Sequence, residues 1–159
     1  MKKLETGSQL PNLCGRNQGG MEIQLTSFIG KKTVVYFYPK DDTPGCTAQA
    51  CSIRDDIDQL KNRGIEVIGI SADSVSAHAK FSSKYDLPFT LISDEAKEFI
   101  NAFGVWGTKK FMGKVYDGIH RTSFLFNENG KLIHVIEKPD TKNHAQEIME
   151  IYETKVERK

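Results

Sequence analysis

Residues 33–71, TVVYFYPKDDTPGCTAQACSIRDDIDQLKNRGIEVIGIS, decide the fold class. They begin with a β-branched and aromatic run, residues 33–38, which is typical of a buried strand. Small or apolar side chains then recur at the spacing of one helix face, at Cys46, Ala50, Ile53, Ile57 and Leu60. Gly64 is well placed to end this helix, and residues 65–71 indicate a second buried strand. The strand–helix–strand unit predicts two parallel strands joined by a right-handed crossover.

The rest of the chain continues this alternation. Ser74 is a candidate N-cap of the next helix, and the run from Asn127 to Gly130 between two apolar segments is a good hairpin signal. The further strands expected are 21–25, 88–92, 122–126 and 131–136, and the further helices are 74–85, 95–103 and 143–153. We therefore expect an α/β fold in which helices flank a mixed central sheet. No repeat, low-complexity tract or linker divides the chain, so residues 1–159 are expected to form one domain.

Composition narrows the classes of function. The 22 basic and 21 acidic side chains give a formal net charge of +1, and the basic residues are scattered, so no nucleic-acid partner is expected. Polar residues follow the N-terminal lysines where a signal peptide would be apolar, and the longest apolar run, 34–38, is far too short to cross a membrane. Three cysteines do not make a disulfide scaffold. We expect a cytoplasmic protein with no membrane partner, whose cysteines are either buried bystanders or reactive groups.

Cys46 is the candidate reactive cysteine. It lies where a parallel strand passes into a helix, at the carboxyl end of the strand, which is where ligands bind in open α/β sheets. Thr43 fits the N-cap and Pro44 fits the first helical position, so Cys46 falls in the first turn. The free N–H groups and the positive end of the helix dipole stabilise a thiolate there. From its position alone, Cys46 could equally be a small buried residue on the inner helix face.

Several spaced motifs resemble one family. Pro39, Thr43 and Cys46 match the peroxiredoxin active-site pattern of proline, three residues, threonine, two residues and cysteine. The flanking motifs resemble the bacterioferritin comigratory protein, or peroxiredoxin Q, subfamily, and they are YFYP at 36–39, TPGCT at 43–47, QAC at 49–51, GIS at 69–71, FTLISD at 89–94, FGVW at 103–106 and GIHR at 118–121. The resemblance covers nearly the whole chain. It implies a thioredoxin-like fold and reduction of hydrogen peroxide and organic hydroperoxides.

The resemblance also implies roles for individual residues. The Cys46 thiolate attacks a peroxide oxygen and becomes a sulfenic acid. Thr43 donates to the thiolate or accepts from the peroxide proton, and Pro39 shields the sulfur from water. Arg121 resembles the active-site arginine of the family, although without that match it reads as a surface salt-bridge residue. Cys51 is the resolving cysteine, and a dithiol protein such as thioredoxin recycles the enzyme. No cofactor or metal is implied, and we expect a monomer.

Acidity alone does not explain a reactive thiol, which bears on Arg121. Lowering the pKa of a thiol from about 8.5 to about 6 raises the thiolate fraction at pH 7 roughly 30-fold. The same change weakens the nucleophile roughly 10-fold if the slope for disulfide exchange applies, so the net gain is only about 3-fold. Most of the acceleration must come from donors aimed at the charge that develops on the leaving oxygen. Arg121 and the N–H groups of the first helical turn are the candidates.

The spacing of Cys46 and Cys51 constrains how they can bond. On an intact helix, a separation of five residues puts the Cα atoms about 9 Å apart, whereas a disulfide needs about 7 Å or less. By spacing alone, Cys51 reads as a partly buried helix residue. The resolving role therefore requires the turn from Thr43 to Cys51 to unwind, and Gly45 weakens that turn by about 1 kcal/mol relative to alanine. Cys14 lies in a Gly- and Asn-containing region without a motif and is expected to be a bystander.

Other functions fit the sequence less well. A thioredoxin-type disulfide reductase has two residues between its cysteines, whereas four separate Cys46 from Cys51. A zinc site needs four suitably spaced ligands, and the histidines are dispersed at 78, 120, 134 and 144. A cysteine–histidine hydrolase needs a histidine beside Cys46, and we interpret His120, the only histidine near the site by resemblance, as structural. A non-enzymatic binding or chaperone module on the same fold would consume no peroxide.

Overall fold

The structure is a computed structural model that describes residues 2–157, with side chains described up to residue 154. The predicted strand–helix–strand unit is present as β3 (Lys32–Phe37), α1 (Pro44–Asp55), α2 (Ile57–Asn62) and β4 (Ile65–Ser71). β3 and β4 pair in parallel. The one helix expected over this stretch is divided at Asp56, whose backbone is not helical.

The remaining elements, in chain order, are β1 (Cys14–Asn17), β2 (Glu22–Gln24), a 3-10 helix η1 (Leu25–Phe28), α3 (Val75–Tyr85), β5 (Thr90–Ser93), α4 (Glu98–Phe103), β6 (Trp106–Phe111), β7 (Lys114–Ile119), β8 (Thr122–Phe126), β9 (Leu132–Ile136) and α5 (His144–Glu157). Of these, β1, η1, β6 and β7 were not predicted from the sequence. Ser74 caps α3 as expected, since its hydroxyl accepts from the N–H of Ala77 at 3.1 Å. None of the helices within residues 2–157 is both long and apolar enough to cross a membrane.

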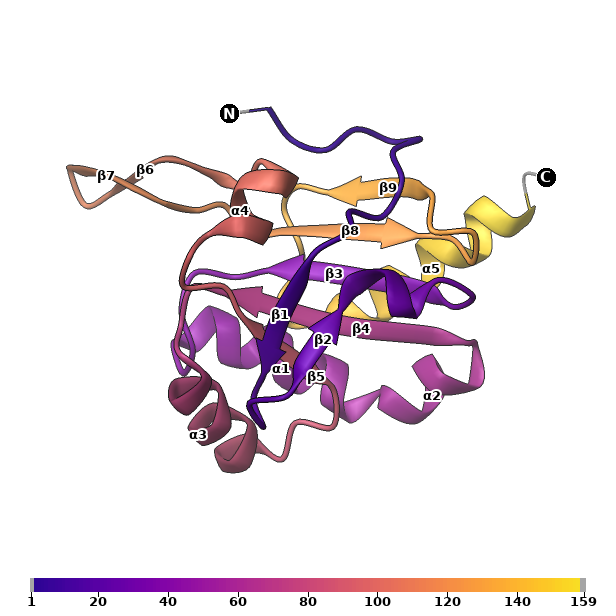
Figure 1. Ribbon diagram of the computed structural model, residues 1–159, viewed down its shortest axis with the longest axis horizontal. Helices are drawn as coiled ribbons and strands as arrows, with labels where there is room; N and C mark the ends of the chain where they lie inside the picture. Colours follow the sequence, from indigo (N-terminus) through magenta and orange to yellow (C-terminus); the bar gives the residue numbers. More distant parts are fainter. Residues whose placement is uncertain (1, 158–159) are drawn as a thin grey trace.

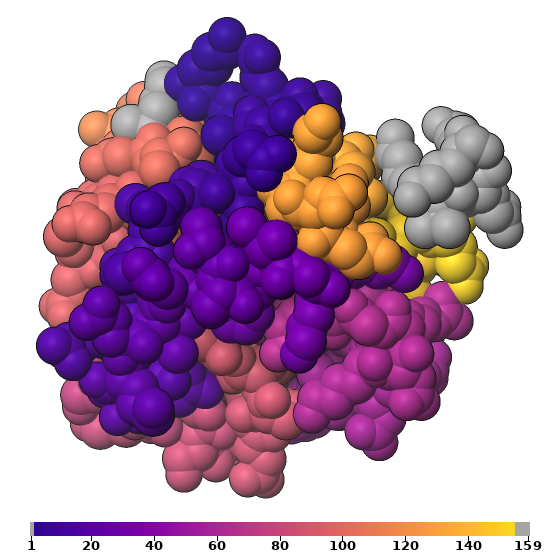
Figure 2. Space-filling view, turned by 45° about the vertical axis from the view of Figure 1, so that its right-hand side comes forward, coloured from indigo at the N-terminus to yellow at the C-terminus, as the bar shows by residue number. Residues whose placement is uncertain are grey.

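Seven strands form one mixed sheet in the order β2-β1-β5-β4-β3-β8-β9 (Figure 1). The central strands β5, β4 and β3 are parallel, and the strands on both sides of them are antiparallel. β6 and β7 form a separate hairpin that extends away from the sheet. The N-terminal segment lies against the β8–β9 turn (Figure 2), where the N–H of Leu10 donates to the carbonyl of Gly130.

Helices cover both faces of the sheet, and β3 is buried between them. Val34 and Tyr36 point to the face covered by α1, α2, α3 and α5, where the core includes Ile53. Val35 and Phe37 point to the opposite face, which η1, α4 and the N-terminal segment cover. Successive side chains of a strand face opposite sides, so this double burial explains why residues 34–38 are all aliphatic or aromatic. The expected fold class, a mixed central sheet flanked by helices, is confirmed.

Candidate active site

Cys46 lies in the first turn of α1, just beyond the carboxyl end of β3, and only 2% of it is exposed. Thr43 occupies the N-cap position and Pro44 begins the helix, as the sequence predicts. The Thr43 hydroxyl does not cap the helix, however. It turns back and donates to the carbonyl of Lys40 at 2.8 Å, so that the loop before α1 is closed on itself. The first N–H groups of α1, which point out of the N-terminal end of the helix where Cys46 lies, therefore have no side-chain cap.

Arg121 reaches Cys46 from the neighbouring strand. It directly precedes β8, whose first residue, Thr122, pairs with Phe37 at the end of β3. The guanidinium Nη2 donates to Cys46 Sγ at 3.4 Å, and Nη1 donates to Gln49 Oε1 at 2.7 Å. These two bonds hold the permanent positive charge of Arg121 beside the sulfur and fix its orientation. Two chain segments that are 75 residues apart thus meet at one sulfur atom.

Gln49 is a site residue that the sequence reasoning did not identify. It is fully buried and lies three residues after Cys46, on the same side of α1. Its oxygen orients Arg121, whereas its Nε2 has no hydrogen-bond partner among the described residues. A buried amide donor without a partner is costly, so Gln49 offers a free donor to an oxygen that enters the site. The helical spacing from Cys46 was the signal that could have indicated it.

Tyr36 is a second buried group with a free hydroxyl in this part of the core. Its hydroxyl also has no hydrogen-bond partner among residues 2–154. Burial raises the pKa of Tyr36 well above its ordinary value, and the negative charge of Cys46 raises it further. Tyr36 therefore stays a protonated phenol and does not compete with Cys46 for the charge of Arg121.

Lys109 adds a second positive charge near the site. It comes from the β6–β7 hairpin, and its Nζ donates to the carbonyl of Ile119 at 3.0 Å. Burial lowers the pKa of Lys109, and the charge of Arg121 lowers it further, whereas Cys46 acts in the opposite direction. The hairpin that the sequence did not predict therefore carries a lysine whose pKa responds to Arg121 and Cys46.

The structure gives the positions of Pro39, Cys51 and Cys14 but does not test the roles predicted for them. Pro39 is half-buried at the exit of β3. Cys51 lies on α1, which is helical without a break from Cys46 onward, and it is a free, half-buried thiol. The two thiols cannot bond in this conformation, because the helix keeps their Cα atoms about 9 Å apart. Cys14 is exposed at the start of β1.

The buried histidines have structural partners. His144 Nδ1 lies 2.9 Å from Glu147, and its Nε2 lies 2.8 Å from the Ser123 hydroxyl. His78 is held by Asp41 beneath the loop before α1. His120 is half-buried next to Arg121, and its ring lies against Gly107 of β6.

Comparison with known proteins places the chain in a family. A model of the AhpC/TSA family matches residues 6–135. Peroxiredoxin Bcp of Escherichia coli (strain K12) is 47% identical over 149 residues, which are 94% of this chain and 96% of the relative. Peroxiredoxin Bcp of Bacillus subtilis (strain 168) is 40% identical over 147 residues, which are 92% of this chain and 94% of the relative.

Solved structures agree with this placement. A cysteine-to-serine mutant of peroxiredoxin Q from Xylella fastidiosa has a TM-score of 0.90 at 26% identity and covers 98% of this chain and 99% of its own. The bacterioferritin comigratory protein of Xanthomonas campestris, studied for alkyl peroxide reduction, has a TM-score of 0.86 at 30% identity and covers 94% of this chain and 98% of its own. The fold is therefore the thioredoxin-like fold of these peroxidases. The chain belongs to the AhpC/TSA family and, within it, to the peroxiredoxins of the bacterioferritin comigratory protein or peroxiredoxin Q group.

Proposed function

We propose that this chain reduces hydrogen peroxide and organic hydroperoxides through Cys46. The observation that carries the proposal is the hydrogen bond of 3.4 Å from Arg121 to the Cys46 sulfur at the start of α1. The Cys46 thiolate attacks one oxygen of the peroxide, the S–O bond forms and the O–O bond breaks. Cys46 is oxidised to a sulfenic acid, and the departing hydroxide or alkoxide takes up, through solvent, the proton that the Cys46 thiol released on ionising, and leaves as water or alcohol.

Arg121 acts on the charge that moves during this step. Negative charge passes from the sulfur to the departing oxygen, and the guanidinium beside the sulfur stabilises both ends of that transfer. Its second bond, to Gln49, fixes the orientation in advance, so little reorganisation is needed when the peroxide reacts. The free Nε2 of Gln49 is placed beside this charge as a further donor.

Thr43 and Pro39 complete the proposed pocket. The Thr43 hydroxyl already donates its hydrogen to the carbonyl of Lys40, so in this conformation its oxygen is available as an acceptor for the peroxide proton. Accepting that proton would direct the peroxide oxygen at the sulfur. Pro39, which has no N–H to solvate, is proposed to keep bulk water from the sulfur on the β3 side.

Cys51 is proposed to resolve the sulfenic acid. Its thiolate attacks the Cys46 sulfur, the S–S bond forms as the S–O bond of the sulfenic acid breaks, and the hydroxide that leaves becomes water with the proton that the Cys51 thiol released. This step requires the first turns of α1 to unwind, because the intact helix separates the two residues. An external dithiol protein, most simply a thioredoxin, then reduces the Cys46–Cys51 disulfide and is itself oxidised. We further propose that the protein works as a monomer in the cytoplasm.

Mass spectrometry after one equivalent of peroxide tests the proposal. The unmodified chain should form a Cys46–Cys51 disulfide, Cys51→Ser should accumulate a sulfenic acid on Cys46, and Cys46→Ser should form neither product. Hydrogen exchange should show loss of protection around residues 46–51 on oxidation, with protection kept beyond Ile57. Peroxide turnover by Cys46→Ser would exclude Cys46 as the nucleophile. A Cys46–Cys14 link or a disulfide between chains would exclude the resolving role of Cys51 and leave the peroxidase proposal standing.

A further inference from the structure

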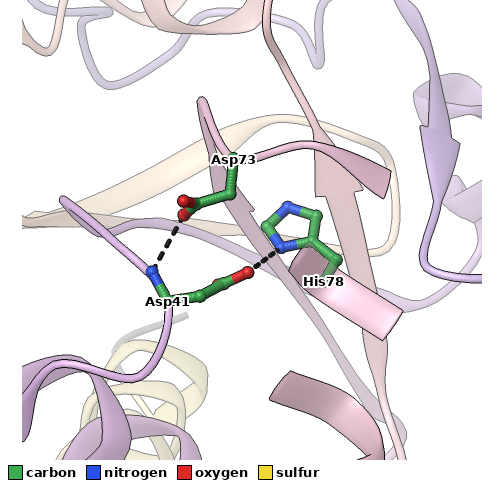
Figure 3. A group of neighbouring side chains, drawn as sticks. All are labelled: Asp41, Asp73 and His78. Atoms are coloured by element: carbon green, nitrogen blue, oxygen red, sulfur yellow. Dashed lines mark hydrogen bonds and ion pairs between the residues drawn. The ribbon is translucent and has the colours of Figure 1, made fainter. Parts of the chain in front are cut away.

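The loop between β3 and α1 is fastened to α3 by a cluster of three side chains, Asp41, Asp73 and His78, of which Asp73 is half-buried (Figure 3). Asp41 Oδ2 lies 2.6 Å from His78 Nδ1, and the backbone N–H of Asp41 donates to Asp73 Oδ2 at 2.9 Å. His78 is fully buried, and Asp41 is only 9% exposed. Asp41 stands two residues before Thr43 and five before Cys46. The place where α1 begins is therefore set by a contact that is not part of the reactive site.

The directions of the hydrogen bonds fix where the protons of this cluster lie. His78 Nε2 faces the carbonyl of Ile92 at 3.0 Å, and a carbonyl only accepts, so Nε2 carries a hydrogen. Asp41 Oδ1 accepts from the Tyr38 hydroxyl at 2.6 Å. Burial raises the pKa of Tyr38, and the nearby charges of Tyr36 and Asp41 raise it further. This phenol therefore remains a donor. A single proton is therefore shared between His78 Nδ1 and Asp41 Oδ2, and both groups are satisfied.

The same three residues offer one nitrogen and two carboxylates within 4.8 Å, a donor set that suits a divalent metal. The observed spacing does not fit a metal between them. Two tetrahedral ligands of zinc, each about 2.0–2.1 Å from the ion, lie about 3.3 Å apart, whereas His78 Nδ1 and Asp41 Oδ2 are 2.6 Å apart. Asp73 is also engaged, because Oδ2 accepts from the Ser71 hydroxyl at 2.6 Å. Hydrogen bonds, and not a metal ion, therefore hold these three side chains together.

α3 is also joined to the chain on the far side of Cys51. Arg54, near the end of α1, donates from Nη1 to the carbonyl of Tyr85 at 2.8 Å. Between this attachment and Asp41, the first turns of α1 are only partly covered, since Pro44 is exposed and Gly45 is half-buried, whereas Cys46 and Gln49 are buried. Asp42 is held to α3 as well, because its carboxylate pairs with Lys84 at 2.8 Å and accepts from the Tyr85 hydroxyl at 2.7 Å. The segment that must unwind for a Cys46–Cys51 disulfide thus lies between attachments to the same helix, and the buried attachment, Asp41–His78, is at its start.

We propose that Asp41 and His78 are positioning residues for Cys46. They hold the loop that places Thr43 and the first N–H groups of α1 around the sulfur, and they set the N-terminal limit of the segment that unwinds. Breaking the pair would leave a buried imidazole or carboxylate without its partner, which is strongly destabilising. Unwinding therefore starts after Asp41 and leaves the Asp41–His78 pair intact. This inference rests on the proposed peroxidase function.

Two substitutions of Asp41 separate positioning from charge. In Asp41→Asn, the amide oxygen still accepts from Tyr38 and the amide nitrogen donates to neutral His78, so each hydrogen bond is kept. In Asp41→Ala, both partners lose theirs. Two rates are compared in the full-length chain by quenched-flow mass spectrometry: oxidation of Cys46 by peroxide and its alkylation by iodoacetamide. Alkylation needs only the thiolate, whereas oxidation also needs the placed donors. The ratio of the two rates therefore reports placement and not merely the amount of folded protein.

Asp41→Ala should lower the ratio of oxidation to alkylation roughly 10- to 100-fold, the range expected when a reacting group moves by about 1 Å. Asp41→Asn should stay within a few-fold of the unmodified chain, and so should Asp58→Ala, the same change at an exposed aspartate of α2. An unchanged ratio in Asp41→Ala would overturn the positioning role. If Asp41→Ala does not fold, comparison of Asp41→Asn with the unmodified chain still tests the positioning role. A large fall of the ratio in Asp41→Asn, which keeps the hydrogen bonds but not the charge, would overturn that role.

A measurement without any substitution tests the limit of unwinding. In the disulfide form of the unmodified chain, hydrogen exchange should keep the amide of Asp41 protected while the amides of residues 47–51, which begin with the bond from Thr47 N–H to the Thr43 carbonyl, lose protection. Loss of protection at Asp41 as well would overturn the proposed limit. Failure of the underlying function has a different signature, because the unmodified chain would then form neither a sulfenic acid nor a disulfide with peroxide.

Discussion

Gly45 lies directly against Arg121, and replacing it with alanine should separate the two steps of the proposed cycle. A Cβ at Gly45 would lie 3.0 Å from Arg121 Nη2 and 3.7 Å from Cζ. The shorter distance is tighter than ordinary van der Waals contact, so the guanidinium has to move by a few tenths of an ångström. Because the same Nη2 donates to Cys46 Sγ at 3.4 Å, the movement weakens the contact that supports peroxide attack.

Two effects of Gly45→Ala can be given magnitudes. A hydrogen bond to a charged group contributes about 1.5–3 kcal/mol, and losing part of it should slow oxidation of Cys46 by about 3- to 10-fold. Alanine also stabilises the helix by about 1 kcal/mol relative to glycine. The unwound fraction then falls by about fivefold, and formation of the Cys46–Cys51 disulfide slows in proportion. Both steps slow, for different physical reasons.

Ala48 provides the matched control, because Ala48→Gly reverses the helix propensity in the same segment of α1. Quenched-flow mass spectrometry resolves the sulfenic acid from the disulfide in each variant. In the double variant Gly45→Ala, Ala48→Gly, disulfide formation should return to the original rate while peroxide attack stays slow. The reasoning would be refuted if the double variant also recovered the rate of attack, since the contact between Gly45 and Arg121 would then have no effect of its own.

Three further predictions concern other residues. Arg121→Ala should slow oxidation of Cys46 by more than the measured change in its thiolate fraction explains, and full recovery of the rate at high pH would contradict this. Cys46→Ser should abolish turnover, whereas Cys14→Ser, at an exposed position, should leave it nearly intact; a large loss in the latter would give Cys14 a role. A hydrogen bond with His144 lowers the pKa of Glu147 from 4.5, so this pair adds stability above about pH 4.5 that is lost as the pH falls. Urea denaturation should therefore show that Glu147→Gln is less stable than the unmodified chain at pH 6 and that the difference narrows toward pH 3, whereas a constant difference would be against the linkage.

The parts of the fold that the sequence predicts are those specified by local pattern. The β-branched and aromatic run at 33–38 and the Ser74 cap each reflect a local preference that the tertiary structure keeps. β1, with the sequence CGRN, has no strand pattern, and it is a strand because it pairs with β2 and β5. The β6–β7 turn was missed because Met112 and Gly113 both adopt positive φ, and methionine is not a residue that signals such a turn.

The candidate site divides in the same way. Thr43 and Cys46 lie at the same helix start, so their separation in the sequence is enough to predict that they are close in the structure. Arg121 lies 75 residues from Cys46, and only the resemblance to a family connected the two before the structure did. The Asp41–His78 pair, 37 residues apart, matches no motif and depends on how α3 packs beneath the loop. Side-chain contacts made by the packing of separate elements cannot be obtained from periodicity.

The two steps of the proposed cycle require opposite behaviour of Cys46, and each step depends on different elements of the structure. Attack on peroxide requires a sulfur held still beside Arg121, whereas resolution requires the same residue to leave its helix. Arg121 directly precedes β8 of the sheet, and Ile53 of α1 is buried in the core. Neither residue therefore has to move when the first turns of α1 unwind. Substitutions in those first turns should therefore alter disulfide formation most, and substitutions of the fixed partners should alter peroxide attack most. Gly45 belongs to both groups, because it lies in the turn and touches Arg121, and a single methyl group there is therefore expected to affect both steps.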